Sequence, residues 1–248
     1  MSAPIRISFV VPAYNEELLL PACLAAIRAE IERCGAAAEV IVVDNAITDR
    51  TSDVAAATPG VTLVHQPKKG LVQARSAGFE ASSGALVANI DADTLLPPGW
   101  LDRVLAEFAA DPGLVTVSGP YDYYDVPMHI RAAARLFYLV GFCTYSFNRW
   151  VMRVGSMVQG GNFVLKRDAL IQAGGFDQSF TFYGEDTDIA RRMNGVGRVK
   201  FTWALMAKSS GRRLRGDGLI MTGVRYSANY LWATYFRKPF TTAWNDYR

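Results

Sequence analysis

Two groups of carboxylates have a spacing that could support chemistry. Asp91 and Asp93 lie one residue apart, directly after the apolar run 85–90. Two carboxylates at this spacing can both reach a hard divalent cation, and Mg²⁺ and Mn²⁺ prefer oxygen ligands. We therefore predict that Asp91 and Asp93 bind Mn²⁺ or Mg²⁺, the alternative being an ordinary surface turn.

The second group, Glu185, Asp186 and Asp188, follows Gly184. Crowded carboxylates repel one another, which raises a pKa and can produce a general base near neutral pH. The alternative is an acidic helix N-terminus, where the helix dipole stabilises negative charge. Taken alone, this group fits the helix N-terminus better than the general base.

The elements that would position these carboxylates alternate between strands and helices. Apolar runs predict strands at 5–11, 39–43, 61–65, 85–90 and 115–119. Helical spacing predicts helices at 16–34, 51–57, 70–82 and 101–110. The alternation indicates an α/β fold with a mostly parallel sheet flanked by helices. Ligands bind at the carboxyl ends of the strands in such sheets, and those ends carry Tyr14, Asn15, Asp44, Asn45, Gln66, Asp91 and Asp93.

The second half of the chain is less regular. Residues 162–166 predict a strand, and 168–173 a helix. Residues 128–154 predict one or two helices, with Gly141 as a candidate break, and a further helix ends at Asn194. Residues after Phe201 show no clean periodicity, so we expect a helical and irregular C-terminal extension.

The charge is distributed unevenly along the chain. Residues 1–186 carry 14 basic and 20 acidic side chains, whereas residues 187–248 carry 12 basic and 3 acidic ones. An acidic body with a basic tail indicates an anionic partner, or else a solvated basic surface. No nucleic-acid partner is expected, because the basic residues match no recognisable nucleic-acid-binding module.

Composition also bears on location. The chain has three cysteines, an odd number with no metal or disulfide spacing, which favours a reducing compartment. The apolar run 136–148 is shorter than the roughly 20 residues of a membrane span, and no signal peptide is evident. We therefore expect a cytoplasmic protein that is soluble or peripheral at a membrane.

One predicted helical face could bind the surface of a membrane. If 128–154 is one helix, Arg131, Arg135, Arg149 and Arg153 share a face, with Tyr138 and Phe142 between them. Basic ends around an aromatic centre suit an interfacial helix on anionic lipid, and residues 230–238 have the same chemistry. The alternative is an acceptor-site or dimer helix in a soluble protein.

The ordered set of motifs resembles glycosyltransferase family 2, which has the nucleotide-sugar-binding fold called GT-A. The matching segments are 8–17, 42–51, 70–78, 91–93, 160–163, 174–177 and 184–186. The resemblance implies a single GT-A domain at 1–215, with a nucleotide-binding half at 1–120 and an acceptor-binding half at 121–215. A basic and aromatic extension would follow at 216–248.

The resemblance also implies a role for individual residues. Nucleotide contacts fall on Pro12, Ala13, Tyr14, Glu16, Asp44, Arg75, Asp91 and Ala92. Asp93 and Asp91 would bind Mn²⁺ or Mg²⁺. Asp186 would take the proton from the acceptor hydroxyl, with Glu185 orienting the acceptor or Asp186. Contacts to the acceptor or to phosphate fall on Gly160, Gly161, Asn162, Arg212 and Arg213.

The implied reaction is an inverting transfer of a sugar from a nucleotide diphosphate sugar to a glycan or a lipid-linked acceptor. UDP-sugar is the favoured donor, with GDP- and dTDP-sugars open. The Gln-x-x-Arg-Trp signature of processive synthases is missing after Asp186, which favours transfer of one sugar. Ile47 stands where the family usually has serine. The sequence does not determine the sugar, the acceptor, the linkage or the oligomeric state.

Two other functions compete with this interpretation. A sugar nucleotidyltransferase has a related sheet, but it needs a glycine-rich phosphate loop after the first strand, and residues 12–15 are not one. A non-catalytic protein that binds a nucleotide sugar or a membrane is the other alternative.

Overall fold

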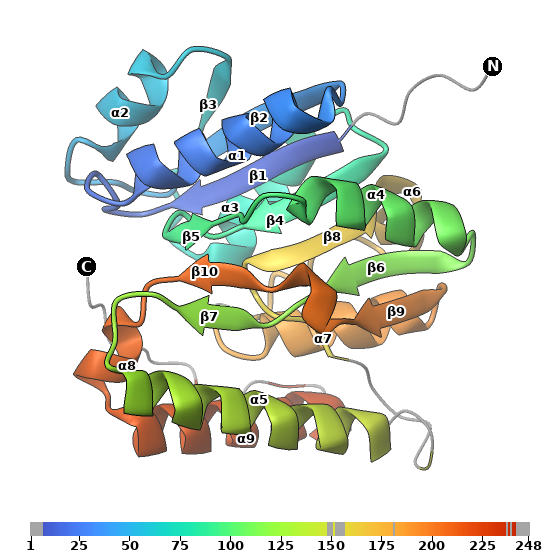
Figure 1. Ribbon diagram of the computed structural model, residues 1–248. Helices are drawn as coiled ribbons and strands as arrows, with labels where there is room; N and C mark the ends of the chain where they lie inside the picture. The colour runs from blue at the N-terminus through green and yellow to red at the C-terminus, as the bar shows by residue number, and fades with distance from the viewer. Residues whose placement is uncertain are drawn as a thin grey trace.

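A seven-stranded sheet forms the centre of the molecule (Figure 1). The computed structural model describes residues 7–147, 151, 157–180, 182–236, 238 and 240–241. The strand order is β3-β2-β1-β4-β8-β6-β9. The strands are β1 (Ile7–Ala13), β2 (Ala38–Asp44), β3 (Val61–His65), β4 (Leu86–Ile90), β6 (Leu114–Ser118), β8 (Asn162–Lys166) and β9 (Arg198–Phe201). Strand β8 pairs antiparallel with β4 and β6, and the other pairs are parallel.

Helices cover both faces of this sheet, as the alternating sequence predicts. They are α1 (Leu20–Cys34), α2 (Thr51–Ala57), α3 (Leu71–Ala81), α4 (Trp100–Ala110), α6 (Arg167–Gln172) and α7 (Glu185–Asn194). Along β1, Phe9 and Val11 belong to the core cluster shared with α1, α2 and α4, whereas Val10 belongs to the cluster shared with α3, α6 and α7. Successive residues of a strand face opposite sides, so a sheet buried on both faces requires a continuous apolar run.

Helix α3 lies unusually close to the sheet at Gly78. A Cβ at this position would collide with the side chain of Val10 on β1. Only glycine therefore permits this approach, which brings Arg75, one turn earlier on α3, close to the strand ends.

A second sheet of three short strands was not predicted. It consists of β5 (Thr94–Leu95), β10 (Ala207–Ser209) and β7 (Tyr121–Tyr123), in that order. Strand β5 follows the Asp91–Asp93 turn, and β10 precedes α8 (Arg212–Gly216). The 3₁₀ turn η2 (Trp203–Leu205) lies between β9 and β10. The small sheet therefore joins the basic C-terminal region to the acidic turn.

Two long helices, α5 (Met128–Phe147) and α9 (Leu219–Phe236), run side by side along one side of the molecule (Figure 1). Helix α5 continues through Gly141, which is no break. Helix α9 contacts α7, and its Ala233 is buried in the core cluster that contains Ile189. The segment predicted as a C-terminal extension thus packs against the rest of the chain.

The predicted lipid-facing surface of residues 128–154 is wrong where the structure describes it. Arg131 and Arg135 both form ion pairs with Asp122 on β7, at 2.5 and 3.2 Å. Tyr138 between them is buried, and Phe142 packs against the core. Ion pairs with Asp122 and packing of the two aromatic rings therefore hold this face against the body, with only the Arg135 side chain about half exposed. Arg149 and Arg153 lie outside the described residues.

Within those described ranges, none of the helices combines the length and hydropathy that a membrane span requires.

Candidate active site

The loops after β1 and β2 are held against each other. The Asn15 Oδ1 accepts the Thr48 backbone N–H at 2.9 Å, and the Thr51 Oγ1 accepts the Glu16 backbone N–H at 2.7 Å. Asp44 accepts the N–H of Ile47 at 3.0 Å, so the turn closes without the family's usual serine. These bonds fix the first two predicted motifs at one edge of the sheet.

Arg75 joins the two acidic groups. Its fully buried guanidinium donates a hydrogen bond to the Glu185 carboxylate, and its Nη2 lies 3.3 Å from the Asp91 Oδ1. Arg75 comes from α3, Asp91 follows β4, and Glu185 begins α7. A buried charge requires paired partners. The family resemblance implies that Arg75 either faces the donor phosphates or holds the metal-site loop, and its contact with Asp91 fits the second role.

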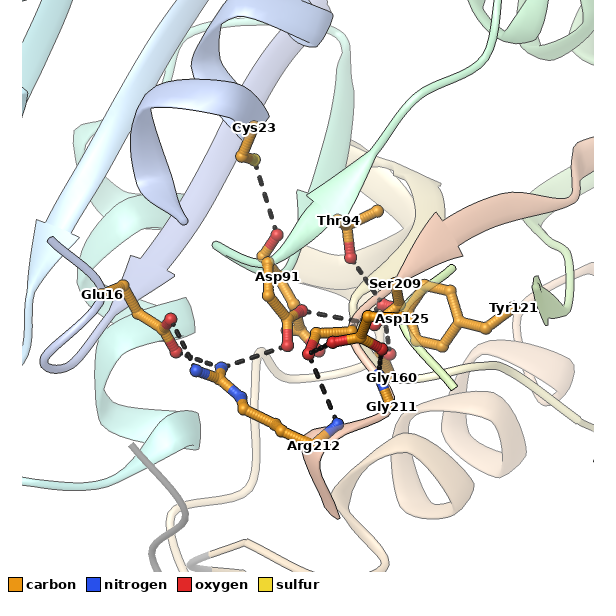
Figure 2. Close-up of polar contacts among 12 residues, drawn as sticks. Glu16, Cys23, Asp91, Thr94, Tyr121, Asp125, Gly160, Ser209, Gly211 and Arg212 are labelled. Carbon is orange, nitrogen blue, oxygen red and sulfur yellow. Dashed lines mark hydrogen bonds and ion pairs between the residues drawn. The ribbon is translucent and has the colours of Figure 1, made fainter. Parts of the chain in front are cut away.

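Asp91 fits against a glycine and a tyrosine. A Cβ on Gly161, whose φ is +76°, would collide with the Asp91 carboxylate. The Tyr121 hydroxyl accepts a hydrogen bond from Thr94 at 3.1 Å and donates one to the Gly160 carbonyl at 3.1 Å (Figure 2). Burial raises the pKa of Tyr121 well above its usual value, so its hydroxyl stays protonated. The Asp91 carboxylate thus occupies a fixed place.

Arg212 is the second cation of the site. Its guanidinium donates to both oxygens of Glu16 and lies 3.1 Å from the Asp93 Oδ2 (Figure 2). Ser209 on β10 donates to the Asp93 Oδ1 at 3.3 Å. Arg212 therefore links the loop after β1 to the acidic turn.

Asp125, which sequence analysis did not single out, anchors the loop that carries Arg212. It accepts hydrogen bonds from the Ser210 hydroxyl at 2.7 Å and the Gly211 N–H at 2.5 Å, and it pairs with Arg215 at 3.0 Å. Burial alone would raise the pKa of Asp125, but these bonds hold it below its usual value. No spacing in the sequence connects Asp125 to a loop so far along the chain.

The second acidic group begins α7, which agrees with the predicted acidic helix N-terminus. Gly184 precedes the helix with φ +80°, and Glu185, Asp186 and Asp188 lie in the first turn. Burial raises the pKa of Glu185 to about 7, although Arg75 opposes this shift. Burial also raises the pKa of Asp186, against the Thr187 N–H, which donates to it at 2.8 Å. A carboxylate with a raised pKa suits proton transfer near neutral pH.

Arg213 lies among aromatic rings. Its guanidinium stands 4.6 Å from the centre of the Phe182 ring and donates to the Tyr183 hydroxyl at 3.2 Å. Among the residues described, no carboxylate lies within ion-pair distance of Arg213. Its charge is therefore available to an anionic ligand.

Most predicted site residues line one cavity of about 1010 Å³. They are Pro12, Glu16, Arg75, Asp91, Ala92, Asp93, Gly160, Glu185, Asp186, Arg212 and Arg213. A small neighbouring pocket of about 40 Å³ is lined by Ala13, Tyr14, Lys69 and Gly70, and shares Pro12 with the cavity. The Lys69 Nζ lies 3.6 Å from the centre of the Tyr14 ring.

Three predicted site residues line neither space. Asp44 accepts hydrogen bonds within its own turn, and Gly161 lies behind Asp91. Asn162 is fully buried: its amide accepts from the Trp100 indole at 3.1 Å and donates to the Leu205 carbonyl at 2.8 Å. Its position argues against acceptor contact, because both ends of its amide hold neighbouring elements together.

The carboxylates fit a divalent cation that arrives with a phosphate-bearing ligand. In the part of the chain that the structure describes, no group of three or more His, Cys, Asp or Glu could hold a metal ion. Asp91 and Asp93 nevertheless both line the cavity. Mg²⁺ is usually bound by one or two carboxylates together with substrate phosphates, so two carboxylates form a suitable half-site.

Comparison with known proteins identifies the family of the chain. The model of the family described as glycosyl transferase family 2 matches residues 8–174. The chain belongs to glycosyl transferase family 2. Both the predicted resemblance and the GT-A fold are confirmed.

Curated relatives of this family 2 chain match it over part of their length. An uncharacterised glycosyltransferase from Mycobacterium tuberculosis is 40% identical over 110 residues, which cover 44% of this chain and 47% of that protein. An undecaprenyl-phosphate 4-deoxy-4-formamido-L-arabinose transferase from Pseudomonas aeruginosa is 36% identical over 132 residues, 51% of this chain and 35% of that protein. The matched region spans less than half of each relative.

Solved structures share the fold over most of the chain. A mannosyltransferase from Pyrobaculum calidifontis, in complex with GDP-Man and Mn²⁺, gives a TM-score of 0.65 at 24% identity, covering 89% of this chain and 63% of that one. Glucosyl-3-phosphoglycerate synthase from Mycobacterium tuberculosis, in complex with Mn²⁺ and UDP-glucose, gives a TM-score of 0.59 at 20% identity, covering 92% of this chain and 78% of that one.

The anchoring role of Asp125 can be tested by limited trypsin digestion. We expect Asp125→Asn to speed cleavage at Arg212, Arg213 and Arg215 about tenfold, because the loop loses charge-assisted hydrogen bonds. The matched control is Asp53→Asn on the exposed part of α2. Equal cleavage rates in Asp125→Asn and the unmodified protein, with unchanged global stability, would show that Asp125 does not hold the loop.

Proposed function

We propose that this glycosyltransferase is metal-dependent and inverting, and that it moves one sugar from a nucleotide diphosphate sugar to an acceptor hydroxyl. The observation that carries the proposal is the meeting of three kinds of group in one cavity. These are the half-buried carboxylate of Asp186, the Asp91 and Asp93 pair, and the arginines 212 and 213. Such a cavity can accept a proton, bind a cation and bind phosphate.

The donor would lie between the strand-end loops and α8. Pro12, Ala13 and Tyr14 offer a surface for the base, and Glu16 offers hydrogen-bond acceptors. Asp44 would support this site by closing its turn. UDP-sugar is the favoured donor. Because one structural neighbour binds UDP-glucose and another binds GDP-Man, both UDP- and GDP-sugars should be tested as donors.

The donor phosphates would meet the cationic side of the cavity. Asp91 and Asp93 would hold Mn²⁺ or Mg²⁺, which when bound neutralises charge on a departing nucleoside diphosphate. Arg213 faces the cavity without a carboxylate partner among the described residues. The Arg212 guanidinium, now on Glu16 and Asp93, would exchange these contacts for phosphate, which it can bind in a bidentate manner.

Asp186 would act on the acceptor. Its carboxylate accepts the hydroxyl proton while that oxygen forms a bond to the anomeric carbon, and the bond from this carbon to the nucleoside diphosphate breaks. A single displacement inverts the configuration. Glu185 is tied to Arg75, so it would position Asp186 and the acceptor.

A donor screen tests the proposed reaction. With Mn²⁺ or Mg²⁺, we expect hydrolysis of one UDP-, GDP- or dTDP-sugar, measured as released nucleoside diphosphate, and its loss when EDTA removes the metal. We expect Asp93→Asn to lower this rate about a hundredfold, because a cation ligand is removed. Asp53→Asn is the control. The absence of hydrolysis and transfer with every donor and either metal would contradict the proposal.

The pH dependence tests the base. Asp186 must be ionised to accept a proton, so the rate should fall as the pH drops through its raised pKa, above the ordinary value of about 4. We expect Asp186→Asn to lower kcat by about 10²–10⁴-fold and to abolish this acid limb. Glu185→Gln should reduce kcat less and retain the limb. An unchanged pH profile in Asp186→Asn would assign the base elsewhere.

A further inference from the structure

The cavity extends beyond the catalytic carboxylates into a space between α5 and α9. Apolar residues and glycines of both helices line this part, which we call the apolar arm. From α5 they are Leu136, Phe137, Val140 and Gly141, and from α9 they are Ile220, Gly223, Val224 and Leu231. The arm is continuous with the space lined by Asp186 and Arg213.

The walls of the apolar arm are exposed to an unusual degree. Leu136 is 62% exposed, Val140 57% and Val224 60%, although all three line the cavity. A contiguous apolar surface that remains exposed marks a binding site more often than an isolated apolar side chain does. The exposed rim therefore gives an apolar ligand a route into the arm from outside.

The space beside two glycines of the apolar arm is open enough to accept a Cβ. A Cβ on Gly141 would meet no atom within 4 Å, and a Cβ on Gly223 would lie 3.6 Å from the Phe137 ring. Because α5 and α9 contact each other, the space between them is too narrow for a further helix, whose diameter is about 10 Å. A flexible chain fits this shape better than a folded partner.

The two ends of the cavity differ in chemistry. At the inner end are the half-buried Asp186 carboxylate and the Arg213 guanidinium, which lacks a carboxylate partner among the described residues. At the outer end are aliphatic and aromatic side chains. A ligand that complements both ends has a polar, hydroxyl-bearing head and a hydrocarbon chain.

We propose that the apolar arm binds the hydrocarbon chain of a lipid-linked acceptor, with its polar head placed at Asp186 and Arg213. This inference rests on the proposed transfer to an acceptor hydroxyl and names the class of acceptor. Arg131 and Arg135 on α5 have no part in it, because both arginines pair with Asp122 and neither lines the cavity.

Calorimetric binding of alkyl ligands, without donor or turnover, tests the proposal. The probes are methyl, hexyl and octyl glucoside and the matched alkyl phosphates, all below their critical micelle concentrations. Each added methylene should tighten binding about threefold to fourfold and make the heat-capacity change more negative. Tighter binding of the phosphates would assign the head-group preference to an anion at Arg213, and tighter binding of the glucosides would assign it to a neutral head.

Substitutions in the apolar arm test where the hydrocarbon chain of the ligand binds. Gly141→Phe and, from the other wall, Gly223→Phe should weaken octyl binding at least about tenfold. Both should leave methyl ligands and donor hydrolysis unchanged. Gly141→Ala adds only a Cβ and should bind like the unmodified protein, as should Leu139→Ser, an exposed α5 position that does not line the cavity. Circular dichroism checks that each variant is folded.

Three results would overturn the inference. They are an affinity independent of chain length, unchanged octyl binding in both phenylalanine variants, or a dimer whose formation excludes the octyl ligand. Donor hydrolysis in any of these cases would leave the proposed function intact. Conversely, chain-dependent binding without activity toward any donor would retain the apolar arm and refute the proposed function.

Discussion

The buried ion pairs of Arg75 are the constraint on which the site depends. A guanidinium that is removed from water must keep its carboxylates, because an uncompensated buried charge is strongly destabilising. Arg75 has Glu185 on one side and Asp91 on the other. These residues belong to α3, the turn after β4 and the start of α7, so one cation fixes three elements. Gly78 makes this possible by letting α3 approach β1.

Arg212 differs from Arg75 in its freedom to change partners. The Arg75 side chain is fully buried, whereas that of Arg212 is 19% exposed and its loop is held by Asp125. A fixed cation suits the positioning of carboxylates, and a more accessible one suits a ligand that comes and goes. The acidic body and basic tail of the sequence thus meet at one site through the small β5-β10-β7 sheet.

The regular part of the fold and the position of the carboxylates at the strand ends could be predicted from sequence. Buried strands form continuous apolar runs and helices have a regular apolar spacing, so both leave a local pattern in the sequence. Asp91 and Asp93 directly follow one such run. The small sheet has strands of two or three residues, which show no period. Helical spacing correctly grouped Arg131 with Arg135, but it could not show that both arginines pair with Asp122. Contacts such as Asp125 with Gly211 join distant segments and leave no local pattern.

A double-mutant cycle on Arg75 and Glu185 tests the central claim most directly. Unfolding free energies of Arg75→Met, Glu185→Gln and the double variant should be measured above the Glu185 pKa of about 7. We predict that Arg75→Met alone destabilises by about 3–5 kcal/mol and that the two changes are coupled by about 1–3 kcal/mol. Additive effects, with no coupling beyond the measurement error, would contradict an account in which this buried pair holds the acidic groups together.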